Sequence, residues 1–97
     1  MTTLARAVID MLLTPSMQAS ATAALDARGL GSCDPAVFTG FVTWPTKTGT
    51  ATVLHSPAAM LLIAEDRRAS ARLVGAAPYD PAALEARDAT IFTKEAA

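Results

Sequence analysis

Hydrophobic side chains recur at helical spacing over the first 30 residues of the chain. This pattern predicts a helix over residues 4–13, in which Arg6 and Asp10 are spaced to form an ion pair. A second, alanine-rich helix is predicted over residues 15–28, with Gly29 as its left-handed C-cap. The apolar positions of the first segment are Leu4, Val8, Met11 and Leu12. We therefore expect two short N-terminal helices.

The pattern changes between residues 35 and 55, where threonine, valine and aromatic residues become frequent. Such residues favour strands, and residues 45–49 have the composition of a turn. The segment therefore predicts a β-hairpin with strands near residues 38–44 and 50–55. In the alternative interpretation, residues 35–44 form a short helix, because Val37, Phe38, Phe41 and Val42 would then share one face.

A third helix is predicted over residues 57–74, between Ser56-Pro57 and Gly75. Residues 60–64 are apolar on every side and residues 65–72 are mostly polar, so the helix should be buried in its first half and exposed in its second. Arg67 falls on the apolar side, where it would either extend its charged end to solvent or pair with a carboxylate. A last helix begins at residues 80–81, carries Leu84, Ile91 and Phe92 on one side, and is expected to fray at residues 94–97.

Four segments combine a helix-capping side chain with a following proline. They begin at Thr14, Asp34, Ser56 and Asp80, and proline suits the first helical position because it needs no N–H partner there. With the patterns above, they predict one domain over residues 1–97 of mainly α (α+β) class, a small helical domain with one β-hairpin. The alternative is an all-α bundle of short helices.

Composition suggests a small core. Hydrophobic residues make up 52% of the 97 residues, but 22 of them are alanine, which leaves 27 large apolar side chains. Ordering each residue costs about 1.5 kcal/mol, so a chain with this few large side chains is marginal by itself. We therefore expect the protein to share apolar surface with its own copies, as a homo-oligomer, or with another protein.

The charge pattern excludes few classes of protein. Eight Lys and Arg residues against nine Asp and Glu give a net charge of −1 without a dense basic block, so nucleic acid is an unlikely partner. Arginine outnumbers lysine and asparagine is absent, which, with the abundant alanine, indicates a GC-rich bacterium or its phage. The longest apolar runs are shorter than a membrane span, and we expect a cytoplasmic protein.

Few residues offer chemistry. Cys33 is the one cysteine and His55 the one histidine, so we expect no disulfide, metal site, cofactor, catalytic residue or small-molecule substrate. A small enzyme would need Cys33 and His55 to meet within about 4 Å. Cys33 precedes a predicted helix N-terminus, where the pKa of a thiol can fall.

The hypothesis that remains is a non-enzymatic protein–protein interaction protein, such as a small accessory subunit, an inhibitor or an assembly component. The alternative is a DNA-binding regulator that uses the helix at residues 57–74 and the hairpin as a wing. The residues expected to contact a partner are Trp44, Tyr79, Ile91, Phe92, Arg68 and Arg72.

Overall fold

The computed structural model describes residues 4–68 and 71–93. Its centre is a four-stranded antiparallel sheet in which the strands follow one another in the order β1-β2-β3-β4. The strands are β1 (Gly40–Pro45), β2 (Gly49–His55), β3 (Ala59–Asp66) and β4 (Arg72–Pro78). The helices are α1 (Leu4–Leu12), α2 (Pro15–Ala27), the 3₁₀ turn η1 (Pro35–Val37), α3 (Pro81–Ala86) and α4 (Thr90–Thr93).

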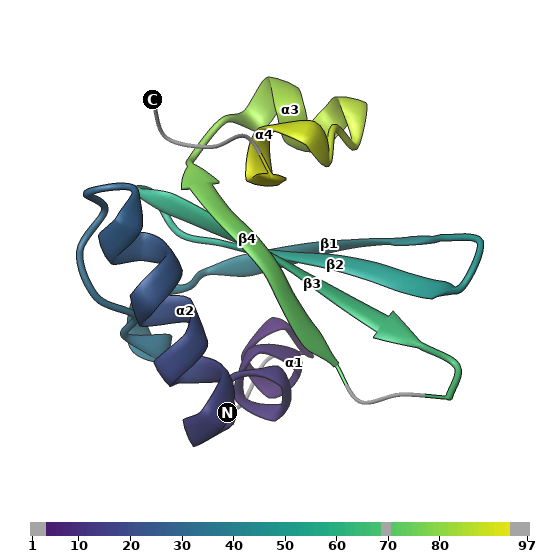
Figure 1. Ribbon diagram of the computed structural model, residues 1–97, viewed down its shortest axis with the longest axis horizontal. Helices are drawn as coiled ribbons and strands as arrows, with labels where there is room; N and C mark the ends of the chain where they lie inside the picture. Colours follow the sequence, from purple (N-terminus) through teal and green to yellow (C-terminus); the bar gives the residue numbers. More distant parts are fainter. Residues whose placement is uncertain (1–3, 69–70, 94–97) are drawn as a thin grey trace.

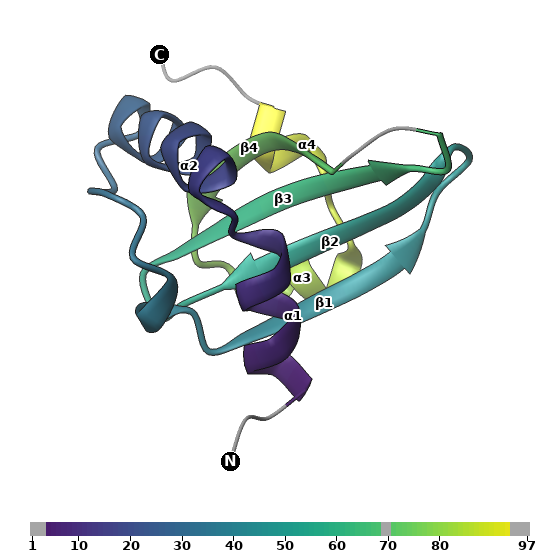
Figure 2. The ribbon, with the colours of Figure 1, turned by 90° about the horizontal axis from the view of Figure 1, so that it is seen from below.

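The sheet lies between two pairs of helices, α1 and α2 on one side and α3 and α4 on the other (Figures 1 and 2). Strand residues point alternately to the two sides, so each side has its own apolar cluster. We call the side covered by α1 and α2 the first face; its buried strand residues are Leu54, Ala59, Leu61, Ile63 and Ala76. The other side is the second face, with Ala51, Val53, Met60, Leu62 and Ala77.

The predicted mainly α class is wrong, and so is the all-α alternative, because the chain forms an α+β fold around this sheet. The error lies in the predicted helix over residues 57–74, where the described residues form β3, the first part of β4 and the turns beside them. An apolar run such as residues 60–64 suits either a buried helix or a strand covered on both faces. Here β3 is a central strand: Leu61 and Ile63 enter the first cluster, while Met60 and Leu62 enter the second.

Ser56 shows how the local signal was misleading. Its hydroxyl accepts hydrogen bonds from the N–H groups of Ala58 and Ala59 at 3.2 and 3.0 Å, just as the carboxylate of Asp80 accepts from Ala82 and Ala83 at the start of α3. After Ser56, however, the chain turns back on β2 and pairs with it. A capping side chain fixes one turn of backbone, and the residues that follow decide whether a helix continues.

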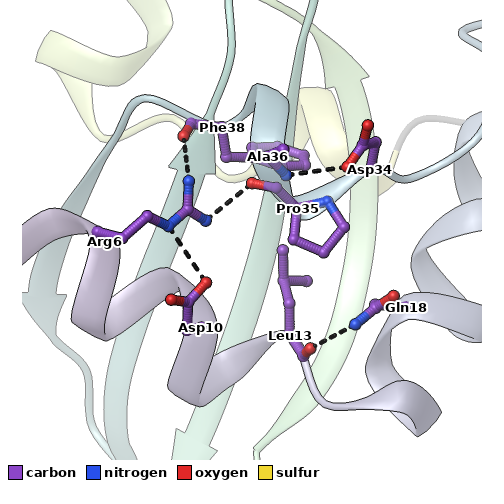
Figure 3. Close-up of polar contacts among 8 residues, drawn as sticks. All are labelled: Arg6, Asp10, Leu13, Gln18, Asp34, Pro35, Ala36 and Phe38. Carbon is purple, nitrogen blue, oxygen red and sulfur yellow. Dashed lines mark hydrogen bonds and ion pairs between the residues drawn. The ribbon is translucent and has the colours of Figure 1, made fainter. Parts of the chain in front are cut away.

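The N-terminal predictions are confirmed. Helix α2 ends as expected: Gly29 has a φ of +69°, and the N–H of Leu30 donates to the carbonyl of Leu25 at 2.8 Å. Arg6 pairs with Asp10 at 3.1 Å and also donates to the carbonyl oxygens of Pro35 and Phe38 (Figure 3). Through these contacts α1 holds the segment that leads into β1.

The predicted hairpin is also confirmed, as β1 and β2 pair from Gly40 opposite His55 to Pro45 opposite Thr50. The last predicted helix is interrupted, because Arg87 takes a left-handed conformation with a φ of +54° and separates α3 from α4. The expected fraying at residues 94–97 lies outside the described residues.

Helix α4 lies directly on β4. A Cβ atom added to Gly75 would collide with the carbonyl oxygen of Phe92, so the missing side chain lets the two backbones approach. The ring of Phe92 is 5% exposed and packs in the second cluster. This contact fixes where α3 and α4 cover the second face.

Candidate interaction surfaces

The two edge strands of the sheet differ in protection. On β4, Arg72 stands at the start, Pro78 at the end, and the pairing with β3 shifts register beside Leu62 and Ile63. Helices α2 and α4 both pack against β4. Strand β1 also ends in a proline, Pro45, and is packed by α1, but it carries no charged side chain and pairs with β2 in an unbroken register. Charges, prolines and bulges are the usual protection of edge strands, so β1 is the less protected edge.

The second face is uncovered at one end. The last row of side chains at this end contains one residue from each strand. Trp44 of β1 lies opposite Ala51 of β2, Ala51 lies opposite Ala64 of β3, and Ala64 lies opposite Arg72 of β4. Ala51 is buried in the second cluster, Trp44 packs against that cluster and is partly buried, Ala64 is partly buried and Arg72 is exposed. In Figure 1 the hairpins extend past α3 and α4 at this end. The row is therefore a shallow surface with an indole at one edge and a guanidinium at the other.

Basic side chains gather at the same end. Lys47 lies in the turn between β1 and β2, and Arg67 and Arg68 follow β3; all three are exposed. The two turns touch, because the backbone N–H of Arg67 donates to the carbonyl of Thr48 at 3.2 Å. We call residues 44–51 and 64–68 together with Arg72 the tip end of the sheet.

The basic side chains at the tip end are unpaired within the described residues. In that part of the chain one salt bridge forms, between Arg6 and Asp10, far from the tip end in sequence. The tip end also holds Glu65 and Asp66, and the Asp66 carboxylate accepts the backbone N–H of Arg68 at 3.0 Å. The expected place of Arg67 on the apolar side of a helix is wrong, since Arg67 is exposed in the turn that follows β3.

The six expected contact residues fall into two groups. Trp44, Arg68 and Arg72 lie at the tip end. Arg68 follows β3 and Arg72 begins β4, so the two arginines do not lie on one helix, as the prediction for residues 57–74 implied. Tyr79, Ile91 and Phe92 lie at the other end of β4, where Tyr79 and Ile91 line a hollow of about 330 Å³. Phe92 itself is buried in the second cluster, so its ring is covered by the protein's own residues.

Tyr79 stacks on His55, with the two ring centroids 5.8 Å apart and the rings 27° from parallel. Burial lowers the pKa of His55 below its usual value of 6.5. His55 lies opposite Gly40, and its ring fills the place that a side chain at Gly40 would take. The contacts of His55 are therefore those of a packed aromatic ring at the end of β2.

Cys33 lies on the other side of the sheet, packed against the first cluster. Burial raises the pKa of its thiol, and the negative charge of Asp34 raises it further. The structure thus gives Cys33 the opposite of the lowered pKa that a helix N-terminus can cause. It also does not bring Cys33 and His55 together, because the side chain of His55 belongs to the second face with Val53.

A groove of about 660 Å³ lies between the α1–α2 elbow and the start of β4. Met11, which is 70% exposed, lies on one wall, and Arg72 and Leu73 lie on the other. Arg72 therefore borders both this groove and the tip end.

Sequence reasoning missed Lys47 and Arg67 as members of a surface group. They are separated by 20 positions in the chain, and only the pairing of β2 with β3 brings their turns together. The threonines and glycine around Lys47 indicated a turn, but nothing local indicated its neighbour.

Within residues 4–68 and 71–93, no group of three or more histidine, cysteine or acidic side chains is placed to hold a metal ion. In the same segments, none of the helices has the length and hydropathy needed to span a membrane. No protein-family model, curated protein or solved structure matches the chain.

Proposed function

We propose that this protein is a non-enzymatic interaction protein that pairs with its own copies through the edge of β1. The observation that supports the proposal is the difference between the two edges of the sheet. Edge β4 carries an arginine and a register shift and is packed by α2 and α4, whereas β1 is packed by α1 but has no charged side chain and no register shift. An exposed strand edge presents unpaired backbone N–H and C=O groups, which a second strand can satisfy.

A second copy is a suitable partner for this edge. Two β1 strands related by a twofold axis perpendicular to the sheet would run antiparallel and extend the sheet from four strands to eight. Because residues 40–45 carry no charge, the pairing would bring no like charges together. Pro45, which lacks an N–H group, stands at the end of the strand, where it does not interrupt the pairing.

The alternative of a DNA-binding regulator depended on a recognition helix at residues 57–74. In the described residues of that range the chain forms β3 and the start of β4, so this design has no helix to place in a DNA groove. The partner proposed here is therefore a protein strand, supplied by a second copy.

Light scattering over about a hundredfold range of concentration tests the proposal, since association depends on concentration. We expect a mass of two chains at high concentration and a fall towards one chain on dilution. The variant Thr43→Lys places a charge in the middle of the β1 edge and should shift the protein to the monomer. Thr43 donates a hydrogen bond to Ala51 at 3.1 Å, so circular dichroism should accompany the measurement to show that the sheet is intact.

The matched control is Thr48→Lys, which makes the same substitution at an exposed threonine in the turn outside β1. It should leave the mass unchanged. A wild-type protein that stays monomeric throughout, or two variants that weaken association equally, would contradict pairing through β1.

A further inference from the structure

We propose that the tip end of the second face binds single-stranded nucleic acid, with a base stacked on Trp44 and phosphates held by the surrounding lysine and arginines. From the sequence, a net charge of −1 argued against a nucleic-acid partner. The structure changes the argument, because it concentrates four of the eight basic residues at one end of the sheet. These residues are Lys47, Arg67, Arg68 and Arg72.

The basic side chains at this end are available to an anion. Among the described residues, none of the four forms a side-chain hydrogen bond or ion pair. They outnumber Glu65 and Asp66, and Asp66 is engaged by the backbone of Arg68. A guanidinium without an internal partner binds phosphate oxygens through paired hydrogen bonds.

The surface between the charges suits flat rings. Trp44 stands on the edge strand and is partly exposed, and the row continues through Ala51, which is buried, to Ala64, which is partly exposed and rises little above the backbone. The row spans three gaps between strands, about 14 Å from Trp44 to Arg72. Aromatic side chains bind single strands by stacking on bases, which is favourable for every base.

A single strand fits this surface better than the other anionic polymers. An acidic polypeptide would meet the same basic side chains, but carboxylates offer no flat ring to stack on Trp44. A duplex keeps its bases stacked inside, out of reach of an indole on an open sheet. Trp44 on the edge strand and the unpaired arginines across the sheet from it therefore favour unstacked bases joined by phosphates.

This proposal does not depend on pairing through β1. Edge pairing would use the backbone of residues 40–45 and leave the tip end of the second face open. The two proposals have different critical residues, Thr43 for association and Arg72 with Trp44 for nucleic acid, so one can fail without the other.

Trp44 is the only tryptophan, so its fluorescence reports directly on the proposed stacking. The probe is an oligothymidylate of about 15 nucleotides, within the range of known single-strand sites. We expect saturable quenching at low salt, with a logarithmic salt dependence of about −0.7 for each phosphate contacted. Three or four contacts would give a slope of about −2 to −3.

Variants then test the site with a fluorescently labelled oligothymidylate, by anisotropy. Arg72→Gln should weaken binding and make the salt slope shallower by about 0.7. Trp44→Ala should weaken binding by about 5- to 150-fold, while Trp44→Phe, which keeps an aromatic ring, should retain most of it. The matched control is Arg87→Gln, which removes the same charge from the exposed residue after α3 and should have no effect.

Three results would overturn the proposal. The first is absence of quenching and of binding at low salt. The second is an equal loss of binding in Arg72→Gln and Arg87→Gln, which would indicate attraction to the whole protein instead of a site. The third is displacement of the oligothymidylate by an equal concentration of oligoglutamate, which would assign the surface to an acidic polypeptide.

Discussion

The two faces of the sheet are covered to different extents. The first face lies under helices of 9 and 13 residues, and the second under helices of 6 and 4 residues. Both faces bury large side chains, such as Leu61 on the first and Met60 on the second. The short helices, however, end before the tip end, where Trp44 and Ala64 remain partly exposed.

This difference shows that the length of the covering helices decides where a small sheet keeps a surface for partners. A helix rises about 1.5 Å per residue, so α3 covers about 9 Å, much less than a seven-residue strand. The first face is therefore core along most of its length. The second is core at one end and surface at the other.

The largest expected effect comes from removing one large buried side chain from the helices that cover each face of the sheet. Ile9→Ala in α1 and Leu84→Ala in α3 should each lower the free energy of unfolding by about 2–5 kcal/mol, because both side chains are buried. We expect Ile9→Ala to lie at the upper end of that range and Leu84→Ala at the lower. The short helix α3 can shift to fill the space, while α1 is held by Arg6. Denaturation by urea measures the free energy of unfolding of both variants. If Ile9→Ala cost no more than Leu84→Ala, the helices on the two faces would not differ in how firmly they are held.

The next effect tests how α4 is seated. Gly75→Ala should cost about 1–3 kcal/mol, because the added methyl group displaces the carbonyl of Phe92 and lifts α4 from the sheet. The exposed ring of Phe92 should then bind a hydrophobic dye. The control is Gly29→Ala, where no atom lies within 4 Å of the added carbon but the φ of +69° costs about 1–2 kcal/mol. Gly29→Ala should destabilise without dye binding, and dye binding in both variants would argue against the proposed contact.

The smallest effect concerns pH at the covered end of the second face. Burial lowers the pKa of His55 in the folded state, so the unfolded chain takes up the proton first as the pH falls. Stability should therefore be full above pH 6.5 and decrease as the pH falls from there through the lower folded-state pKa. Melting temperatures between about pH 7.5 and about pH 5 measure this, and His55→Gln should flatten that part of the profile. A wild-type profile as flat as that of the variant would show that His55 is not buried as described.

The sequence predicted some elements well because their signals are local. The Schellman ending of α2 needs only Gly29 and the contact of Leu30 with Leu25, all within six residues. The hairpin of β1 and β2 likewise depends on strand-forming residues on both sides of a short turn. The capping side chains of Thr14, Asp34 and Asp80 each begin a helical turn as expected.

The same kind of signal failed at residues 57–74, because two structures satisfied it equally. Whether a helix or a strand follows, Ser56 caps the turn that precedes it and residues 60–64 need apolar surroundings. The polar residues 65–68 indicated the exposed half of a helix, but they form the end of β3 and the turn that follows it. The choice depends on β2, whose own residues 51–54 are buried and need a strand beside them.

The site could be predicted only in part. Trp44 and Arg72 were expected to contact a partner, but their place in one row across the sheet follows from three strand pairings. By itself, the sequence determined the N-terminal helices, the first hairpin and the capped turns at Thr14, Asp34 and Asp80, since these depend on neighbours a few residues away. Only the tertiary structure decided that residues 59–66 form a central strand, that two turns 20 residues apart bring four basic side chains together, and that one edge of the sheet stays open. Each of these depends on which strands pair, and pairing between distant residues is set by the burial of whole faces and not by local preference.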